Sequence, residues 1–497
     1  MTPDPPRTSP GLRHSSAWWP RTPPSTWVRL DNAANIFLAT RSDIDTKVFR
    51  LAAELDEMVD PAVLQEALDR VYAQYPLFRA VLRQGIFWYY LQESDRHPVV
   101  AEDVAPSVTH LYRFDSRDLL FRVLHRGHRI SLEVFHALTD GTGALWFFQD
   151  LLTEYLGLRH PEEFAAAAPT GRSGVKQEFT VDAFSQWFGS RRGAGAFIEE
   201  ATTPVGSTSS LVADNAGGPV ASHEKASHPH TRSRRVVRVR GRLTPDRRTR
   251  VVEVSVPVRP MLDLARAEGV SLTIYLIALF FESLRATRVL RREARTMAVS
   301  VPVNLRQFFP SASGRNFFAT IRLMHQYGVD SGADSLGAVC RSLDEQFQSQ
   351  LTQDGLQRKI RRLVRFERHP LLRFIPRPLK DAVLGAVNHL NNRGITVAIS
   401  NLGRVALPAP ADPHVRRMFL HVSAARPQLS AISHGDVLTV SFTSPFVETD
   451  YHAAFVRHLT DRGVAVRVNA SRVTAQELAE AEGDPSRLET CARRRQR

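Results

Sequence analysis

The stretch EVFHALTDGTG, residues 133–143, decides the fold of this chain. It places His136 four residues before Asp140, and Gly141 follows directly. Apolar residues alternate before His136, which predicts a strand, and apolar residues recur at helical spacing after Gly143, at Leu145, Phe148, Leu152 and Tyr155. A polar group between a half-buried strand and an amphipathic helix is held by a rigid scaffold, as functional groups usually are. The stretch is therefore either a catalytic motif or a structural turn.

The chemistry that His136 offers is general base catalysis. A neutral imidazole with an ordinary pKa of about 6.5 can accept a proton from an alcohol or an amine at neutral pH. The freed nucleophile can then attack an activated acyl group without a covalent enzyme intermediate. A metal site would need His136 and Asp140 on one face of a helix, and Gly141 and Gly143 favour a loop there instead. We predict no metal and no cofactor.

The composition is that of a globular protein that binds anions. The chain has 497 residues, which favours two domains, and 43% of them are hydrophobic. Its net charge is +14, carried mostly by arginine. A basic chain favours anionic partners such as nucleotide phosphates, nucleic acid or acidic lipid. No zinc-finger spacing, basic heptad region or RNA-binding aromatic motif is present, so we do not predict nucleic-acid binding.

The cysteines and the N-terminus predict a cytoplasmic protein. The two cysteines, Cys340 and Cys491, lie far apart in the sequence, and such a pair fits a reducing compartment. Cys340 lies in an amphipathic helical pattern and is predicted to be a core thiol. The first residues contain no apolar segment typical of a secretion signal. The longest apolar run, residues 272–281, is shorter than the roughly 20 residues that span a bilayer.

Composition and periodicity divide the chain into five parts. Residues 1–27 are rich in proline and arginine and are predicted to be disordered, and residues 476–497 form a polar tail. Residues 28–170 and 246–475 alternate strand and helix patterns and are predicted to form two α/β lobes. Between them, residues 171–245 are polar and small, which indicates a linker or crossover. His223, His228 and His230 lie in this low-complexity linker, so they do not predict a metal site.

A basic stretch, residues 356–380, carries nine arginines or lysines and a single glutamate. Its apolar residues cluster on one helical face, and prolines at 370, 376 and 378 interrupt the pattern. Three interpretations stay open. The stretch is a solvated helix packed on the second lobe, a docking face for coenzyme A phosphates, or a helix that contacts a membrane surface peripherally.

The motif FHALTDG resembles the H-x-x-x-D-G signature of the acyl-coenzyme-A-dependent acyltransferase superfamily. That superfamily shares the chloramphenicol-acetyltransferase-like fold and includes the condensation domains of peptide synthetases. The chain is most similar to its bacterial alcohol-acetyltransferase-like branch. Four further stretches, spread over roughly residues 28–470, carry the resemblance: YPLFRAVLR with GIFWYYL, GVSLTIYLIALFFESL, VPVNLRQFFPSASGRNFF and ISNLGRV. The resemblance implies a two-lobed α/β fold with mixed sheets and a tunnel between the lobes.

The resemblance also assigns roles to residues. It makes His136 the general base and implies that Asp140 points away from the substrates and pairs with Arg306, bracing the loop through a buried, bidentate contact. Surface exposure is the alternative for Arg306. Many relatives carry a second histidine before the base, where this chain has Phe135.

The SNLG segment and Gly141 are weaker candidates for the site. The resemblance places Ser400 or Asn401 at the tunnel, and an ordinary turn is the alternative for that segment. Gly141 is a candidate for keeping the loop open for coenzyme, or for offering its N–H to an oxyanion.

The expected activity is transfer of an acyl group from acyl-coenzyme A, as co-substrate, to a small alcohol or amine. An alternative donor is a thioester on an acyl carrier protein, as in natural-product biosynthesis. A second alternative is a catalytically silent binding module of the same fold. These alternatives predict different results with free coenzyme A thioesters, with carrier-bound thioesters and with ligand alone.

Overall fold

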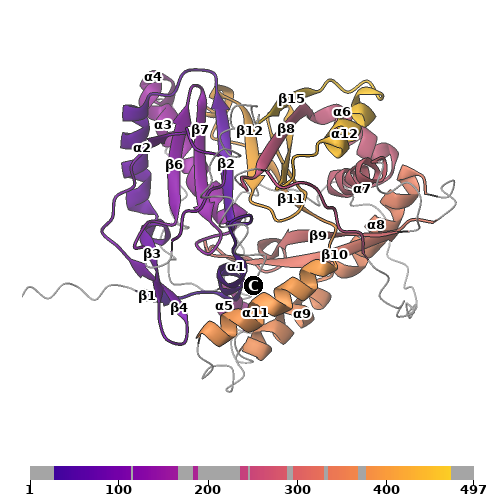
Figure 1. The fold of residues 1–497 in the computed structure, drawn as a ribbon. Coiled ribbons are helices and arrows are strands. Elements are labelled where there is room, and N and C mark those ends of the chain that lie inside the picture. The colour runs from indigo at the N-terminus through magenta and orange to yellow at the C-terminus, as the bar shows by residue number, and fades with distance from the viewer. Residues whose placement is uncertain are drawn as a thin grey trace, which may run out of the picture.

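The computed structural model describes residues 27–113, 116–165, 183–188, 236–244, 247–287, 295–328, 334–367 and 377–471. These residues form two lobes that lie side by side (Figure 1). Nearly all of the predicted disordered segment 1–27 and most of the predicted linker 171–245 lie outside the described residues. The predicted tail 476–497, the histidines at 223, 228 and 230, and Cys491 lie outside them too.

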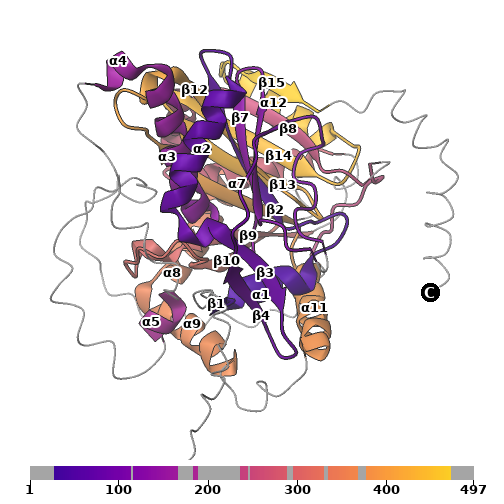
Figure 2. The same cartoon turned by 90° about the vertical axis from the view of Figure 1, so that its left-hand side faces the viewer.

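The N-terminal lobe is built on a five-stranded sheet in the order β12-β2-β7-β6-β5. Its strands are β2 (Val48–Leu55), β5 (Ala101–Glu102), β6 (Phe121–Arg126), β7 (Arg129–Phe135) and β12 (Val415–Val422). All neighbouring strands are antiparallel except β5 and β6. Two long helices, α2 (Pro61–Gln74) and α3 (Gly141–Arg159), cover one face of this sheet (Figure 2), and the short α4 (Pro161–Phe164) follows α3.

Local sequence explains the helix and the hairpin that support the motif. The α2 helix begins at Pro61, because the Asp60 carboxylate accepts hydrogen bonds from the N–H groups of Ala62 and Val63 and a proline suits the first helical position. The β6–β7 hairpin turns at Gly127, whose φ of +57° suits glycine. The hairpin therefore delivers the end of β7 to the start of the motif.

A small sheet and a helix join the first lobe to the second. The sheet has the order β1-β4-β3, with β1 (Trp27–Arg29), β3 (Ala80–Gln84) and β4 (Tyr89–Glu93), and the 3₁₀ helix η1 (Pro76–Arg79) precedes β3. Helix α1 (Asn32–Thr40) follows β1 and begins at Asp31, whose carboxylate accepts from the N–H of Ala34. Helix α1 lies against α11 (Arg377–Arg393), as Figure 1 shows.

The C-terminal lobe is built on a seven-stranded sheet in the order β10-β9-β11-β13-β14-β8-β15. Strand β11 runs parallel to β9 and β13, and the other neighbours are antiparallel. The strands are β8 (Arg250–Pro257), β9 (Thr296–Asn304), β10 (Phe318–Gln326), β11 (Val397–Val405), β13 (Gln428–His434), β14 (Val437–Ser444) and β15 (Arg467–Ala470). This sheet and the first one agree with the predicted pair of α/β lobes.

Helices pack around the second sheet and enclose its core. They are α5 (Ala183–Phe188), α6 (Val258–Ala267), α7 (Leu272–Arg285), α8 (Leu336–Gln350), α9 (Gln353–Glu367) and α12 (Asp450–Thr460), with the 3₁₀ helices η2 (Leu305–Gln307) and η3 (Asp412–His414). Helix α7 begins at Ser271, which accepts from the N–H of Ile274, and is almost wholly buried. Cys340 in α8 is also buried, and its burial raises the pKa of its thiol to about 12, as expected of a core thiol.

Strand β12 corrects the predicted boundary between the lobes. Residues 246–475 were expected to form the second lobe alone, but β12 pairs with β2 and so completes the sheet of the first lobe. Apolar residues before β12 and at its start, such as Leu407 and Val415, belong to the first lobe's core. The reason is that β2 can pair with a strand on each side. Strand β7 occupies one side, and β12, although distant in the sequence, pairs with the backbone groups on the other.

Charged side chains cross the interface between the two sheets. Arg129 in β7 contacts Glu253 in β8 with an N–O distance of 2.7 Å, and His421 in β12 lies 3.0 Å from the same carboxylate. Burial alone would raise the pKa of Glu253, but hydrogen bonds and charges from His421 and Arg129 outweigh it and lower that pKa far below its usual range. The glutamate is therefore ionised and ties both lobes together.

None of the described helices is by itself long and apolar enough to cross a membrane. Helices α6 and α7 meet that criterion only when they are taken together, and the chain bends by 83° between them.

Candidate active site

His136 lies immediately after β7, at the point where the strand leaves the sheet. Its backbone N–H donates to the carbonyl of Lys47 across 2.8 Å, and its own carbonyl accepts from the side-chain amide of Asn316 across 3.0 Å. Residues 136–138 form a turn, so His136 and Asp140 do not share a helix face. The backbone of His136 is thus held by both lobes, because Lys47 precedes β2 and Asn316 precedes β10.

Asp140 caps α3 and at the same time binds the second lobe. One carboxylate oxygen accepts from the N–H of Gly143 across 3.0 Å, which is the N-cap bond of the helix. The other oxygen accepts from Nη1 of Arg306 across 2.7 Å and from the N–H of Phe317 across 2.9 Å. Both carboxylate oxygens are therefore occupied by protein donors, and neither is directed at a substrate.

Arg306 is buried, so the alternative of a surface arginine is wrong. Its guanidinium donates from Nη2 to the carbonyls of Ser313 and Arg315, and it lies 5.4 Å from the centre of the Trp146 ring. It meets Asp140 through one nitrogen, whereas a bidentate contact was expected. The difference arises because Nη2 is used by the two backbone carbonyls, so that the arginine ties the 313–315 backbone to the motif as well.

The two glycines of the motif lie in the first turn of α3, whereas a loop was expected there. A Cβ at Gly143 would lie 2.2 Å from Oγ1 of Thr139 and 2.3 Å from the carbonyl oxygen of Gly314. A Cβ at Gly141 would lie 2.9 Å from the side chain of Leu402 in β11. Glycine is needed because the second lobe approaches the helix so closely, and the helix tolerates it because Asp140 caps the turn.

The ring of His136 lies among aromatic side chains. It stacks on Phe37 of α1 with a centroid distance of 4.2 Å and an interplanar angle of 25°, and Phe49 and Phe318 lie 4.8 and 6.1 Å away. Its Nδ1 is buried and has no hydrogen-bond partner among the described residues. Burial lowers the pKa of His136 to about 4, and the negative charge of Asp140 opposes this without outweighing it. The imidazole is therefore neutral at neutral pH.

Phe135 fills the core of the first lobe. Its side chain is fully buried and stacks on Tyr112, with ring centroids 5.8 Å apart. As the last residue of β7, it points to the opposite side from its neighbour, His136. A phenylalanine at this position is thus a packing residue and does not displace the candidate base.

The SNLG segment is part of a bulged strand, so the alternative of an ordinary turn is wrong. Ser400 and Asn401 lie within β11, and the register against β13 shifts between Asn401 and Arg404. The Asn401 side chain donates to Thr273 and accepts from the N–H of Gly403, whose φ is +74°. Of this segment, it is Leu402 that reaches the motif, at Gly141. A role for Ser400 or Asn401 in substrate binding stays a prediction.

The basic stretch forms parts of two helices. Leu356 and Ile360 of α9 are buried in a small core with Phe309 and Phe317, which agrees with a helix packed on the second lobe. The ammonium group of Lys359 donates one hydrogen bond to the carbonyl of Thr320 across 2.6 Å. A docking role of the stretch for coenzyme A phosphates stays a prediction. Residues 368–376 of the stretch lie outside the described residues.

Three contributors to the site were not predicted, namely Phe37, Asn316 and the ion pair of Arg315 with Asp31. Arg315 and Asp31 are almost fully buried, and their nitrogen and oxygen atoms lie 3.6 Å apart. This pair anchors the start of α1, which carries Phe37, to the same 313–317 segment that holds the motif. The only signal in the sequence was the polar run SASGRN inside an apolar region, and its partners are distant in the chain.

Comparison with solved structures identifies the fold. TRI101 from F. sporotrichioides, solved with coenzyme A and T-2, is 12% identical, with a TM-score of 0.51 over 89% of this chain and 100% of that one. The trichothecene 15-O-acetyltransferase TRI3 from Fusarium sporotrichioides is 9% identical, with a TM-score of 0.52 over 87% and 95%. The first condensation domain of the calcium-dependent antibiotic synthetase is 16% identical, with a TM-score of 0.50 over 88% and 96%.

No protein-family model matches the sequence, and a comparison with curated proteins finds no match either. The structural similarity extends over nearly nine-tenths of the chain and almost the whole of each related structure. The chain therefore has the two-lobed chloramphenicol-acetyltransferase-like fold that acetyltransferases and peptide-synthetase condensation domains share.

Proposed function

We propose that this protein transfers an acyl group from an acyl-coenzyme A thioester to an alcohol or amine, with His136 as general base. The observation that carries the proposal is a neutral imidazole, on a residue of intermediate exposure, whose backbone is held by both lobes. Its Nδ1 is enclosed, which leaves Nε2 as the nitrogen that a substrate can reach. Two proteins of the same fold, TRI101 and TRI3, support this reaction class.

In the proposed reaction, Nε2 of His136 accepts the proton of the acceptor hydroxyl or amine as that group attacks the thioester carbonyl. A tetrahedral oxyanion forms, the carbon–sulfur bond then breaks, and the proton on the imidazole passes to the departing thiolate. General base catalysis of this kind contributes on the order of 10²–10⁴ in rate. Asp140 and Arg306 do not exchange protons in this scheme. They fix the loop that aims His136.

The aromatic surroundings of His136 suit this role. Phe37 stacks on one face of the ring and fixes its plane, so that little motion is lost when the acceptor binds. A base with a lowered pKa stays unprotonated over the whole neutral range, although each proton transfer to it is less favourable. The apolar walls would also exclude water, which competes with the acceptor for the acyl group.

The test is an acyl-transfer assay with the purified full-length chain. Acetyl-coenzyme A and longer acyl-coenzyme A esters are offered with a panel of alcohols and amines, and thiol release and product mass are measured. Turnover that requires His136 and survives His128→Gln, a change at an exposed histidine in the β6–β7 turn, supports the proposal. Turnover only with a carrier-bound thioester would identify the condensation-type donor. Ligand binding without turnover from any donor would identify a silent binding module.

We also propose that the protein is cytoplasmic and that α11 contacts a membrane surface. Large apolar side chains are exposed along α11, namely Leu379, Val383, Val387 and Leu390. The β3–β4 turn, with exposed Ile86, Phe87 and Trp88, lies beside it, because the Lys380 ammonium group donates to the carbonyl of Phe87. Exposed apolar residues beside basic ones are typical of helices that lie on anionic membranes.

A further inference from the structure

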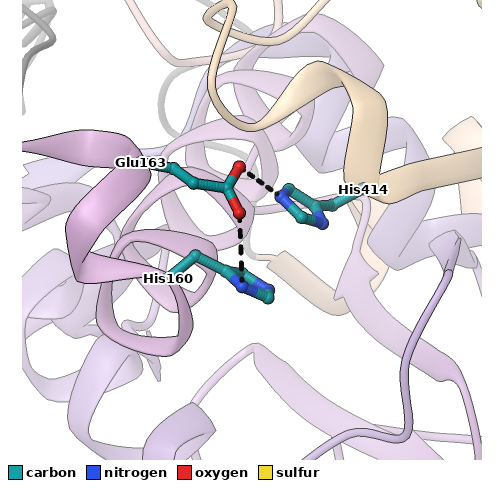
Figure 3. A group of neighbouring side chains, drawn as sticks. All are labelled: His160, Glu163 and His414. Atoms are coloured by element: carbon teal, nitrogen blue, oxygen red, sulfur yellow. Dashed lines mark hydrogen bonds and ion pairs between the residues drawn. The ribbon is translucent and has the colours of Figure 1, made fainter.

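A second cluster of chemically capable side chains lies in the first lobe, away from His136. His160, Glu163 and His414 each offer a ligand atom, and these atoms all lie within 4.8 Å of one another. The Glu163 carboxylate lies to one side of both rings (Figure 3), with one oxygen 3.1 Å from Nε2 of His414 and the other 3.8 Å from Nδ1 of His160. The two imidazoles are stacked, with ring centroids 4.1 Å apart.

We propose that His160, Glu163 and His414 bind a divalent transition-metal ion of the zinc type, with water completing the coordination. Imidazole and carboxylate are the ligands that such ions prefer. A tetrahedral zinc ion holds nitrogen ligands at about 2.0–2.1 Å, so its ligand atoms lie about 3.3 Å from one another. The Glu163 oxygens lie 3.1 and 3.8 Å from the two ring nitrogens, and all three ligand atoms lie within 4.8 Å of one another. The rings are nearly parallel in this structure, so on binding they would have to turn until the lone pairs of both nitrogens point at one ion.

Asp56 supplies the outer contact that metal-binding histidines usually have. Its carboxylate lies 2.9 Å from Nδ1 of His414. A histidine that donates its Nδ1–H to a carboxylate keeps Nε2 unprotonated and aimed at the metal, and the carboxylate makes that nitrogen more basic. The Nε2 of His414 faces Glu163, which is where the ion would lie. In a neutral ring, Asp56 would therefore hold the tautomer that a metal requires.

The three ligands come from two segments that are distant in the sequence, the junction of α3 with α4 and the 3₁₀ helix η3. His160 ends α3 by donating its N–H to the carbonyl of Leu156, and Pro161 then starts α4, which carries Glu163 one turn later. His414 ends η3 and directly precedes β12, in a segment far from α4 along the chain. Both histidine side chains are mostly buried, whereas Glu163 is 55% exposed. Glu163 therefore provides the entry path for an ion.

A proton is the competitor of the metal in this cluster. Burial would lower the pKa of His414, but its hydrogen bonds to Asp56 and Glu163 outweigh burial and raise that pKa. A protonated His414 would make the same cluster a network of ion pairs. Metal binding must displace that proton, because only the neutral ring is a ligand. The experiment must therefore separate a metal site from an ion-pair network.

A metal ion at this site would stabilise the folded state and take no part in acyl transfer. Helix α3 has 19 residues, so the cluster at its end lies about 28 Å from the motif at its start. Glu163 and His414 are 251 residues apart in the chain, so a shared ion would tie α4 to the segment that leads into β12. Linking residues so far apart stabilises the folded state. This inference does not depend on the proposed function.

The test uses the full-length chain without an affinity tag, stripped with a chelator, in a background with His223, His228 and His230 changed to Gln. Zinc chloride alone is titrated by calorimetry, and cobalt chloride by visible absorbance, which reports four-coordinate ligation. We expect one equivalent of zinc to bind and to raise the melting temperature. His160→Asn and Glu163→Gln should abolish both effects and the cobalt band. Asp56→Asn should weaken zinc binding by about 10–100-fold.

Two controls keep the result decisive. His97→Gln changes an exposed histidine in the same lobe and should leave zinc binding unaltered. The metal-free His160→Asn and Glu163→Gln proteins should melt close to the metal-free parent, which shows that they fold. The inference is overturned if the stripped parent binds no zinc equivalent, in which case the cluster is an ion-pair network only. It is equally overturned if the bound equivalent survives both substitutions.

Discussion

Arg306 donates from Nη1 to Oδ2 of Asp140 across 2.7 Å, and each side chain is only 7% exposed. The two residues are 166 positions apart and come from different lobes. Because the other oxygen of Asp140 caps α3, this one contact joins the start of the helix, the motif loop and the second lobe. A carboxylate so fully bonded to protein groups cannot assist a reaction directly. Its effect on activity must pass through the position of His136.

Removing Asp140 should therefore destabilise the protein. Asp140→Ala leaves Arg306 buried without its charge partner, which typically costs about 3–5 kcal/mol. Arg306→Ala should be similarly damaging, and the double variant should lose less than the sum of the two. Asp140→Asn is the matched variant, since it can keep the N-cap bond to Gly143 while it loses the charge. Chemical unfolding measures all four. A stable but inactive Asp140→Ala protein would instead make Asp140 part of the chemistry.

His136 should behave in the opposite way. His136→Ala should lower kcat by on the order of 10²–10⁴ while the melting temperature stays near that of the parent. The reason is that Asn316 and Lys47 hold the backbone of His136, and alanine keeps both of these backbone hydrogen bonds. The acyl-transfer assay and a thermal melt are run on the same preparation. Full activity in His136→Ala would show that the motif is not catalytic.

The pH dependence should reflect the lowered pKa of His136. Its folded-state pKa is about 4 and its ordinary value is 6.5, so it stays neutral as the pH falls from about 8 to about 6. We expect no loss of kcat/KM from this group over that range, and a falling limb only near pH 4. An acidic limb centred on the ordinary value of 6.5 would contradict the burial argument.

The same shift has a consequence for stability. Below pH 6.5 His136 becomes protonated in the unfolded chain, whereas in the folded chain it stays neutral down to about pH 4. The free energy of unfolding therefore decreases as the pH falls from 6.5 to about 4. His136→Gln should remove that part of the acid destabilisation. The free energy of unfolding of both proteins, measured at several pH values in the window, tests this. Parallel curves for the two proteins would contradict it.

Gly143 should tolerate no side chain. A methyl group there would meet the carbonyl oxygen of Gly314 at 2.3 Å, and a backbone atom cannot rotate away. Gly143→Ala should therefore destabilise the protein by about 1–3 kcal/mol, shift the motif loop and lower activity. Gly157→Ala is the matched control in the same helix, because its nearest neighbour is the Phe164 side chain at 3.3 Å. Equal unfolding free energies for the two variants would contradict the close approach of the lobes.

The membrane contact is tested on α11 itself. Changing Leu379, Val383 and Leu390 together to Ser should abolish co-sedimentation with anionic vesicles and leave the melting temperature nearly unaltered, since these side chains are exposed. Neutral vesicles are the control for the contribution of the basic residues. Equal binding of the parent and the triple variant would show that α11 does not contact the membrane.

Local patterns in the sequence were sufficient for much of the fold and for the position of the motif. The strand before His136 and the helix that follows the motif were both predicted, because each depends on the periodicity of neighbouring residues. The partner of Asp140 came from the resemblance of FHALTDG and VPVNLR to a known superfamily. Periodicity and spacing alone could not have paired residues in different lobes.

Tertiary structure decided what depends on contacts between distant segments. The sequence predicts β12 as part of the second lobe, but an open strand edge in the first lobe recruits it. Gly141 and Gly143 predict a loop from the sequence, but they lie in the first turn of α3. Glycine is required there because Leu402 and Gly314 of the second lobe approach the helix closely. His160, Glu163 and His414 form no sequence motif, since the last is 251 residues from Glu163. Hydrogen bonds within one element follow from local residue order, whereas packing between lobes depends on the whole folded chain.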